Sequence, residues 1–182
     1  PDLFHSNRVL RVDDYPTRLL QTLMSLAPKK CDSSVPTVVL LTPGHLNSAY
    51  YEHTFLSDQM GIEMVEAQDL FVENDFLYMK TVDGPKKIDV VYRRIDDDYL
   101  DPLAYNPNSV IGVPGITHVY KTGGVNICSA PGAGIADDKA VYIYVPEMIK
   151  FYLGETPILD NVQTWRCERD DDLKYVLENI DE

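Results

Sequence analysis

Short apolar segments that end in unusual loops recur along this chain. Residues 37–42 form an apolar run too short for a helix, which is typical of a strand buried on both faces of a parallel sheet. The next segment predicts a helix that Asn47 or Ser48 caps and that Gly61 ends, followed by strand-like residues 62–65. This order predicts a β-α-β unit.

The same pattern continues through the middle of the chain. A β-hairpin is expected over residues 70–79, a second buried strand over 88–92 and a third over 125–128. Helical spacing of apolar residues predicts a cover helix over 13–26, and Pro114 can begin a helix that stops at a glycine pair. The predicted fold class is therefore α/β, with an open, mostly parallel, Rossmann-like sheet, covering helices and a β-hairpin.

The C-terminal part carries helical patterns. Asp137 or Asp138 is expected to cap a helix that begins at Lys139, and Pro146 should break or kink that helix. A further helix is expected to begin near Asp170. Lys139 opens its helix just after a flexible loop, where a side chain could reach a nucleotide phosphate, although a lysine at such a place is more often solvated.

The composition narrows the range of partners. The chain has 16 Lys+Arg against 29 Asp+Glu, and the formal net charge of −13 repels nucleic acid and anionic lipid. Its 3 cysteines are far apart and form no Cys-x-x-Cys pair, which predicts neither a disulfide framework nor a zinc site. No apolar run approaches the roughly 18 residues of a membrane span. The prediction is a cytoplasmic protein with neither nucleic-acid nor membrane partners.

An arginine pair marks the end of the second predicted strand. Arg93 and Arg94 follow the apolar residues 88–92, and three aspartates follow at 96–98. Ligands of open α/β sheets bind beyond the carboxyl ends of the strands, where two guanidinium groups could hold a carboxylate or phosphate. The aspartates could then orient the arginines or contact an ammonium group. The alternative is that these opposite charges pair with one another on a solvated turn.

Two further patterns invite a cofactor or metal interpretation that the spacing does not support. Gly132 and Gly134 follow a strand and precede a helix, but a dinucleotide fingerprint needs a third glycine where this chain has Asp137. The glycines therefore predict a structural turn. His45 and His53 lack the HExxH spacing of a zinc protease, so no metal site is predicted from them.

Three motifs resemble one known family. Residues 92–98 read YRRIDDD, residues 130–139 read APGAGIADDK, and residues 157–165 read PILDNVQTW. They are similar to the circularly permuted ATP-grasp family (type 2), which is related to glutathionylspermidine synthases, and the resemblance covers nearly the whole chain. It implies that residues 1–136 are a central, pre-ATP-grasp-like α/β domain and that residues 137–182 begin an incomplete ATP-grasp nucleotide lobe. The chain is then expected to be a central fragment of a longer protein.

The resemblance also implies residue roles. Catalysis would fall to Arg93 and Arg94, and nucleotide binding to Asp138 and Lys139, where glutathionylspermidine synthase relatives have an Asn-Lys pair with the lysine on ATP. The residues implied in substrate binding lie in the three loops, and they are Asn47, Ser48, Glu52, Asp96, Asp97, Asp98, Asn126, Pro131 and Gly132.

The implied reaction is ATP-dependent ligation of a small-molecule carboxylate and an amine, through an acylphosphate that the amine converts to an amide. ATP and Mg²⁺ are expected in the full-length protein but not on the fragment, which is expected to contain no metal ligands. Other expected partners are the rest of the protein's own chain and a second copy, through an apolar surface near residues 151–165. The alternative is a domain that retained the fold for binding or interaction and lost the chemistry.

Overall fold

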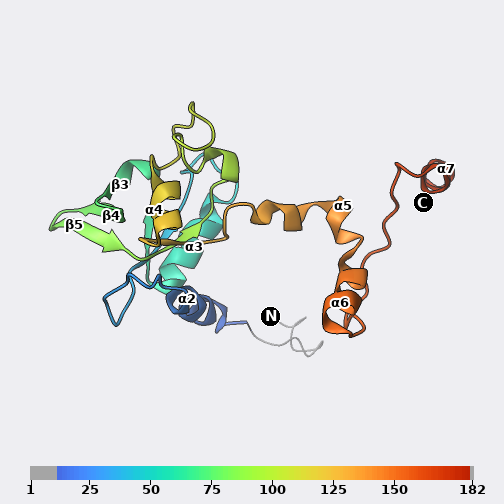
Figure 1. Ribbon diagram of the computed structural model, residues 1–182, viewed down its shortest axis with the longest axis horizontal. Helices are drawn as coiled ribbons and strands as arrows, with labels where there is room; N and C mark the ends of the chain where they lie inside the picture. Colours follow the sequence, from blue (N-terminus) through green and yellow to red (C-terminus); the bar gives the residue numbers. More distant parts are fainter. Residues whose placement is uncertain (1–11, 181–182) are drawn as a thin grey trace, which may run out of the picture. The chain divides into compact units, whose positions relative to one another are not determined.

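The computed structural model describes residues 12–180 of the chain. The chain divides into two compact units, with the division between Pro131 and Gly132. The motifs had placed this boundary a few residues later, between 136 and 137. The first unit contains both β-sheets, and the described residues of the second unit form helices and irregular segments (Figure 1).

The core of the first unit is a parallel sheet of four strands in the order β2-β1-β6-β7. Its strands are β1 (Val38–Leu41), β2 (Glu63–Val65), β6 (Val90–Arg93) and β7 (Asn126–Cys128), and every neighbouring pair is parallel. The expected open parallel sheet is thus confirmed. Because β2 and β6 lie on opposite sides of β1, the strand order reverses there, which is where ligands of such sheets bind.

A second sheet consists of three antiparallel strands, β3 (Leu70–Glu73), β4 (Phe76–Thr81) and β5 (Gly84–Ile88), drawn in green in Figure 1. The predicted hairpin corresponds to its first two strands. The prediction of one strand over 88–92 was wrong, because the chain changes sheets at Asp89. The buried Asp89 carboxylate accepts the Thr37 N–H over 2.9 Å at this junction.

The two faces of β1 are buried against different elements. Helices α2 (Tyr15–Ser25) and α3 (Tyr50–Met60) cover the face that carries Val38 and Leu40. The antiparallel sheet and helix α4 (Ile116–Thr122) cover the face that carries Val39 and Leu41. A continuous apolar run is what a strand with two buried faces requires, so the sequence interpretation of residues 37–42 is confirmed.

The ends of two helices of the first unit differ in detail from expectation. The residue before α3 is Ala49, and neither Asn47 nor Ser48 caps the helix; the Asn47 side chain instead accepts the Ala49 N–H over 2.9 Å. Gly61 ends α3 in a left-handed conformation with φ 67°, as predicted. Helix α4 begins at Ile116, directly after Gly115, whereas the predicted start was Pro114.

The second unit begins with a short 3₁₀ segment, η3 (Ala133–Asp137), followed by α5 (Lys139–Tyr142), α6 (Val145–Leu153) and α7 (Asp170–Glu178). The Asp138 carboxylate accepts the Ala140 N–H over 2.8 Å, which confirms the predicted cap. Pro146 lies in the first turn of α6 after α5 has ended, and this confirms the predicted break.

Candidate functional site

Three loops of the first unit leave the sheet at one edge. They follow β1, β6 and β7, which are parallel neighbours, so their carboxyl ends lie together. Side chains join these segments: Arg93 donates to Ser129 O over 2.8 Å, and Arg94 donates over 2.6 Å to Glu52 in the first turn of α3, the helix that follows the first loop. The predicted shared edge is confirmed for these loops as far as Pro131, the last residue of the first unit.

Arg93 is buried and bonded on all sides of its guanidinium group. Its Nε donates to Ser129 O over 2.8 Å, Nη1 to Ile95 O over 2.7 Å and Nη2 to Ala130 O over 3.4 Å. Nη1 also lies 2.7 Å from the Asp97 carboxylate. The guanidinium group of Arg93 is thus engaged by the protein itself, and the catalytic role that the resemblance implied stays a prediction.

Arg94 is the arginine that faces the edge. Its Nη2 contacts Glu52 Oε1 over 2.6 Å, and its guanidinium lies 5.8 Å from the centre of the Tyr92 ring. The Arg94 side chain keeps 27% of its surface exposed and Glu52 keeps 53%, so solvent reaches both partners. An incoming anion can therefore bind the remaining N–H groups of this guanidinium or displace Glu52 from it.

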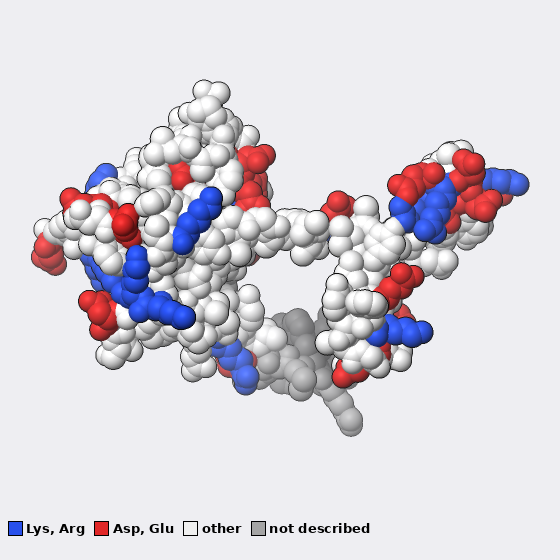
Figure 2. Space-filling view, in the orientation of Figure 1, with Lys and Arg blue, Asp and Glu red and all other residues white. Residues whose placement is uncertain are grey.

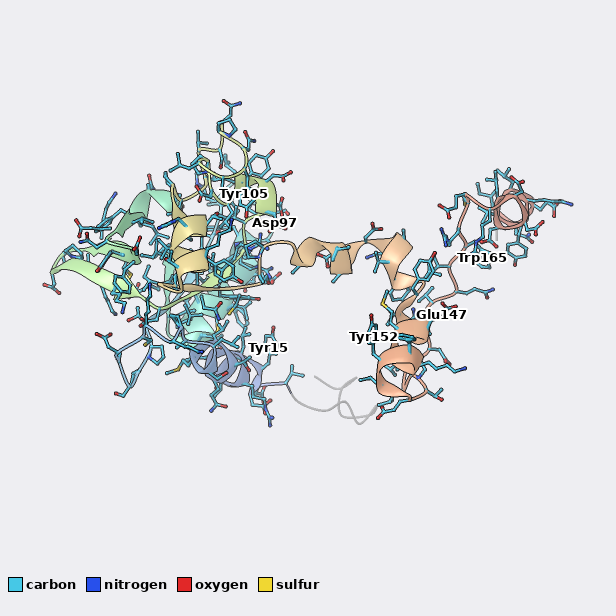
Figure 3. All side chains as sticks on the ribbon, viewed as in Figure 1. Tyr15, Asp97, Tyr105, Glu147, Tyr152 and Trp165 are labelled. Carbon is cyan, nitrogen blue, oxygen red and sulfur yellow. The ribbon has the colours of Figure 1, made fainter. Side chains whose placement is uncertain are left out.

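The three aspartates after β6 have different surroundings. Asp97 begins a 3₁₀ turn, η2 (Asp97–Tyr99), and pairs with Arg93. Asp96 and Asp98 expose their side chains, while their carbonyl groups accept backbone N–H groups of the same loop. Acidic side chains gather at this part of the first unit in Figure 2, and Figure 3 labels Asp97 there. The alternative of opposite charges that pair on a solvated turn therefore describes Asp97, which pairs with Arg93, whereas Asp96 and Asp98 contribute exposed side chains to that turn.

A buried histidine, His53, contacts the start of the loop after β1. His53 Nδ1 lies 2.9 Å from the Thr42 hydroxyl, which also accepts the Gly44 N–H over 3.3 Å. Burial lowers the pKa of His53, the positive charge of Arg94 lowers it further, and Glu52 acts in the opposite direction. A neutral imidazole that accepts the Thr42 proton at Nδ1 fits this environment.

Asp101 is an organising residue that the sequence interpretation missed. It is 1% exposed, and its carboxylate accepts the N–H groups of Leu103, Gly115 and Thr117 at 2.9, 3.0 and 3.0 Å. Burial acts to raise the pKa of Asp101, but these backbone donors overcome it, and the pKa lies below its ordinary value. The Asp-Pro pair at 101–102 is a turn signal that could have revealed the residue.

Glu66 is another acidic residue that the sequence interpretation did not identify. It follows β2 and caps the 3₁₀ turn η1 (Ala67–Asp69). Gly44 has φ 99°, and a Cβ added there would lie 3.3 Å from Glu66 Oε1, so the first loop passes directly over this carboxylate. Glu66, which follows β2, and Thr42, which follows β1, both line a small cavity of about 70 Å³.

Asn126 does not join the other predicted residues. It begins β7 and pairs in register with Val90 at the start of β6, which places it at the amino end of the sheet. Its Nδ2 donates to Leu26 O over 2.6 Å, and its Oδ1 accepts the Ile127 N–H. These contacts support the fold at the amino ends of the strands. Asn47 and Ser48 lie at the opposite, carboxyl ends, in the loop after β1.

The second unit has a cavity of its own beside Lys139. The cavity has a volume of about 500 Å³, and its lining includes Lys139, Tyr144, Trp165 and Arg166. The exposed Lys139 donates to the carbonyl of Asp137 over 3.2 Å, and the Arg166 guanidinium lies 5.2 Å from the Tyr144 ring centre. Figure 3 labels Trp165. Cationic and aromatic groups thus share one hollow of about the size of a small-molecule site.

Within residues 12–180, His, Cys, Asp and Glu side chains form no group of three or more that could hold a metal ion. Nor is any helix in that range both long and apolar enough to cross a membrane.

All 182 residues match a family model described as a circularly permuted ATPgrasp. The chain belongs to this family. The type 2 assignment and the link to glutathionylspermidine synthases both stay predictions.

The chain is similar to parts of several longer proteins. It is 51% identical over 182 residues to an uncharacterized protein of Synechocystis and 50% identical over 183 residues to one of Mycobacterium tuberculosis. All of this chain is matched in both cases, but only 37% and 33% of the relatives' lengths. A Frankia alni protein, provisionally named a glutamate–cysteine ligase, is 38% identical over 182 residues, which are 21% of its length. The chain spans about a third of the first two relatives and about a fifth of the third.

Proposed function

We propose that this chain is the central part of a longer ATP-dependent carboxylate–amine ligase. The observation that carries the proposal is Arg94, a partly exposed guanidinium at the point where the order of a parallel sheet reverses, in a chain of the ATP-grasp family. The Frankia relative, provisionally named for the joining of glutamate and cysteine, supports a ligase reaction. Because that name belongs to a protein about five times as long, the acid and the amine are not carried over.

Arg94 would bind the acid substrate. A carboxylate can accept two parallel N–H bonds from a guanidinium, and such charge-assisted pairs are stronger than neutral hydrogen bonds. Glu52 would hold the Arg94 side chain in place before the substrate arrives. When the anion enters, the Arg94 N–H group that Glu52 accepts would become free to bind the anion. Asp96 and Asp98, which expose their side chains nearby in the chain, could contact the ammonium group of an amine.

The proposed reaction has two steps. An oxygen of the carboxylate attacks the γ-phosphorus of ATP and releases ADP, which leaves an acylphosphate. The amine nitrogen then attacks the acyl carbon, the carbon–oxygen bond to phosphate breaks, and the nitrogen loses a proton to give the amide. In the first step, Arg94 would position the attacking oxygen, and in the second it would stabilise negative charge on the acyl oxygen.

The second unit would contribute to nucleotide binding. Lys139 lies at the start of α5 and lines a cavity with two aromatic side chains, Tyr144 and Trp165. A lysine can neutralise a phosphate, and aromatic rings can pack against a base. Mg²⁺ bound with ATP would neutralise the phosphate charge, and its ligands are not assigned to residues 12–180, which hold no suitable cluster.

A non-catalytic binding domain is the second candidate. Two observations favour it. The Arg93 guanidinium group donates to backbone carbonyl groups of the protein itself, and Arg94 already forms an ion pair with Glu52. The two candidates agree that the edge binds an anion and disagree about ATP turnover.

One experiment separates them. The complete reading frame that contains this chain is incubated with ATP, Mg²⁺ and a panel of amino acids and polyamines, and ADP and new amides are measured by mass spectrometry. ATP-dependent amide formation that Arg94→Met abolishes and Arg18→Met leaves intact supports the ligase; Arg18 is an exposed arginine on α2. Anion binding without ADP release in any mixture would leave the binding domain as the better account.

A further inference from the structure

Arg93 and Arg94 have the same chemistry and adjacent positions, but the structure gives them opposite surroundings. The Arg93 side chain is 7% exposed and the Arg94 side chain is 27% exposed. Arg94 has an acid and a tyrosine as partners, whereas Arg93 donates mainly to backbone carbonyl groups. A side chain that binds carbonyl groups of a loop fixes the course of that loop.

The carbonyl groups that Arg93 holds belong to two different loops. Ile95 O lies in the loop after β6, and Ser129 O and Ala130 O lie in the segment after β7. The planar guanidinium reaches both loops at once, which the single ammonium group of a lysine cannot do with the same geometry. Asp97 balances the buried positive charge at 2.7 Å.

The segment after β7 needs such an anchor. Ser129 has φ 22°, a positive value that residues with a side chain rarely adopt, and a conformation of this kind persists only when its surroundings fix it. Its carbonyl group is the acceptor for Arg93 Nε. Cys128 precedes it as the last residue of β7, and the first unit ends soon afterwards at Pro131.

This short segment is also the root of the glycine loop, residues 130–134. The chain enters the second unit at Gly132, and the proposed nucleotide residues Asp138 and Lys139 follow within the same stretch. Movement of Ser129 and Ala130 would therefore also move the residues that lead to Asp138 and Lys139, because no helix or strand lies between β7 and η3.

We infer that Arg93 is a positioning residue that anchors the root of the glycine loop, while Arg94 contacts the substrate. The importance of this anchor for catalysis rests on the proposed ligase function, whereas the ordering of the loop does not. Arg93 thus acts through the backbone of Ser129 and Ala130 and not on the reacting groups.

The first test measures hydrogen exchange of backbone amides in the 182-residue chain. Arg93→Lys and Arg93→Met are compared with the matched variants Arg94→Lys and Arg94→Met. Loss of the carbonyl contacts should speed exchange in residues 129–137 by about 10-fold or more in both Arg93 variants, with little change in either Arg94 variant. If Arg93→Met does not fold, Arg93→Lys decides, because it keeps the charge beside Asp97. Unchanged exchange in Arg93→Lys, or an equal change in Arg94→Lys, would overturn the inference.

The second test separates positioning from direct substrate contact in the complete protein. Arg93→Lys should lower kcat and leave the KM for the acid nearly unchanged, whereas Arg94→Lys should raise that KM. A raised KM for the acid with unchanged kcat in Arg93→Lys would contradict the assignment. If the complete protein shows no ligase activity, the proposed function fails, and the exchange measurement still decides whether Arg93 anchors the loop.

Discussion

Arg94 Nη2 and Glu52 Oε1 lie 2.6 Å apart, and this contact joins the loop after β6 to the first turn of α3 at the carboxyl ends of the parallel strands. Both side chains are open to solvent. Such a pair contributes only about 0–1 kcal/mol to the free energy of unfolding. Its main effect is therefore on where the guanidinium points and on how readily an anion reaches it.

Glu52→Gln should strengthen anion binding at this edge. The variant removes the carboxylate that competes with the substrate for Arg94 but keeps a side chain of the same shape. We expect the KM for the acid to fall about 2- to 5-fold in the complete protein, in keeping with the modest energy of an exposed pair. Glu63→Gln, an exposed glutamate on β2, is the matched control. A higher KM in Glu52→Gln would show that Glu52 assists the substrate and does not compete with it.

The buried His53 predicts a loss of stability in mild acid. Burial and the nearby Arg94 lower its pKa in the folded state, while the unfolded chain has the ordinary value near 6.5. Above that pH both states are neutral at this position. As the pH falls below it, the unfolded state takes up a proton first, and the free energy of unfolding falls by up to about 1.4 kcal/mol per pH unit until the folded state also protonates.

Urea unfolding between pH 7.5 and pH 5 would measure this effect, with the pH values taken around the titration range of histidine, roughly 6.5. His53→Gln should weaken the dependence, because glutamine does not titrate. The Arg94→Met variant should also raise the pKa of His53, which NMR titration of the ring can detect. An identical pH profile in wild type and His53→Gln would contradict the interpretation.

Asp101 should contribute more to stability than any of the acids that the motif identified. Asp101→Ala leaves the N–H groups of Gly115 and Thr117 without their buried acceptor, and the cost should be about 2–4 kcal/mol. The exposed Asp98 provides the comparison, and Asp98→Ala should change the free energy of unfolding by less than about 0.5 kcal/mol. Chemical denaturation measures both. Equal effects of the two variants would refute the assignment.

The same carboxylate sets an expectation for acid. Because the pKa of Asp101 is lowered in the folded state, its contribution is present above the unfolded value near 3.8 and is lost as the pH falls below that value. Asp101→Ala should therefore flatten the stability profile in strong acid, in a pH range distinct from that of His53.

Local pattern predicted most of the sheet but not where its strands change partners. The run Ile88–Tyr92 is apolar apart from Asp89, and nothing in its neighbours indicates that residue 88 pairs with the antiparallel sheet. The partner of Asp89 is Thr37, which lies 52 positions earlier. Asp101 was missed for the same reason, because Gly115 and Thr117 are 14 and 16 residues further along the chain.

The location of the candidate site could be predicted from the sequence, but the separate roles of its residues could not. Parallel strands bring the loops to one edge, and this follows from a pattern that a sequence displays. The roles of Arg93 and Arg94 depend on which side of the strand each guanidinium leaves, and on carbonyl groups at Ser129 and Ala130 that any residue type could supply. Residue identity alone carries no information about such contacts.

Lys139→Ala is the most direct test of the second unit. The Lys139 side chain is exposed, and its ammonium group contacts the carbonyl of Asp137, so its removal should not unfold the unit. If Lys139 binds a phosphate, the dissociation constant of ATP in the presence of Mg²⁺ should rise by about 10-fold, the value of one charge-assisted hydrogen bond. Isothermal titration calorimetry on the complete protein measures the constant, and a thermal melt confirms that the fold is retained. Lys150→Ala, an exposed lysine on α6, should bind ATP like the wild type. An unchanged dissociation constant in Lys139→Ala would remove this lysine from the nucleotide site and leave the cavity beside it without a proposed ligand.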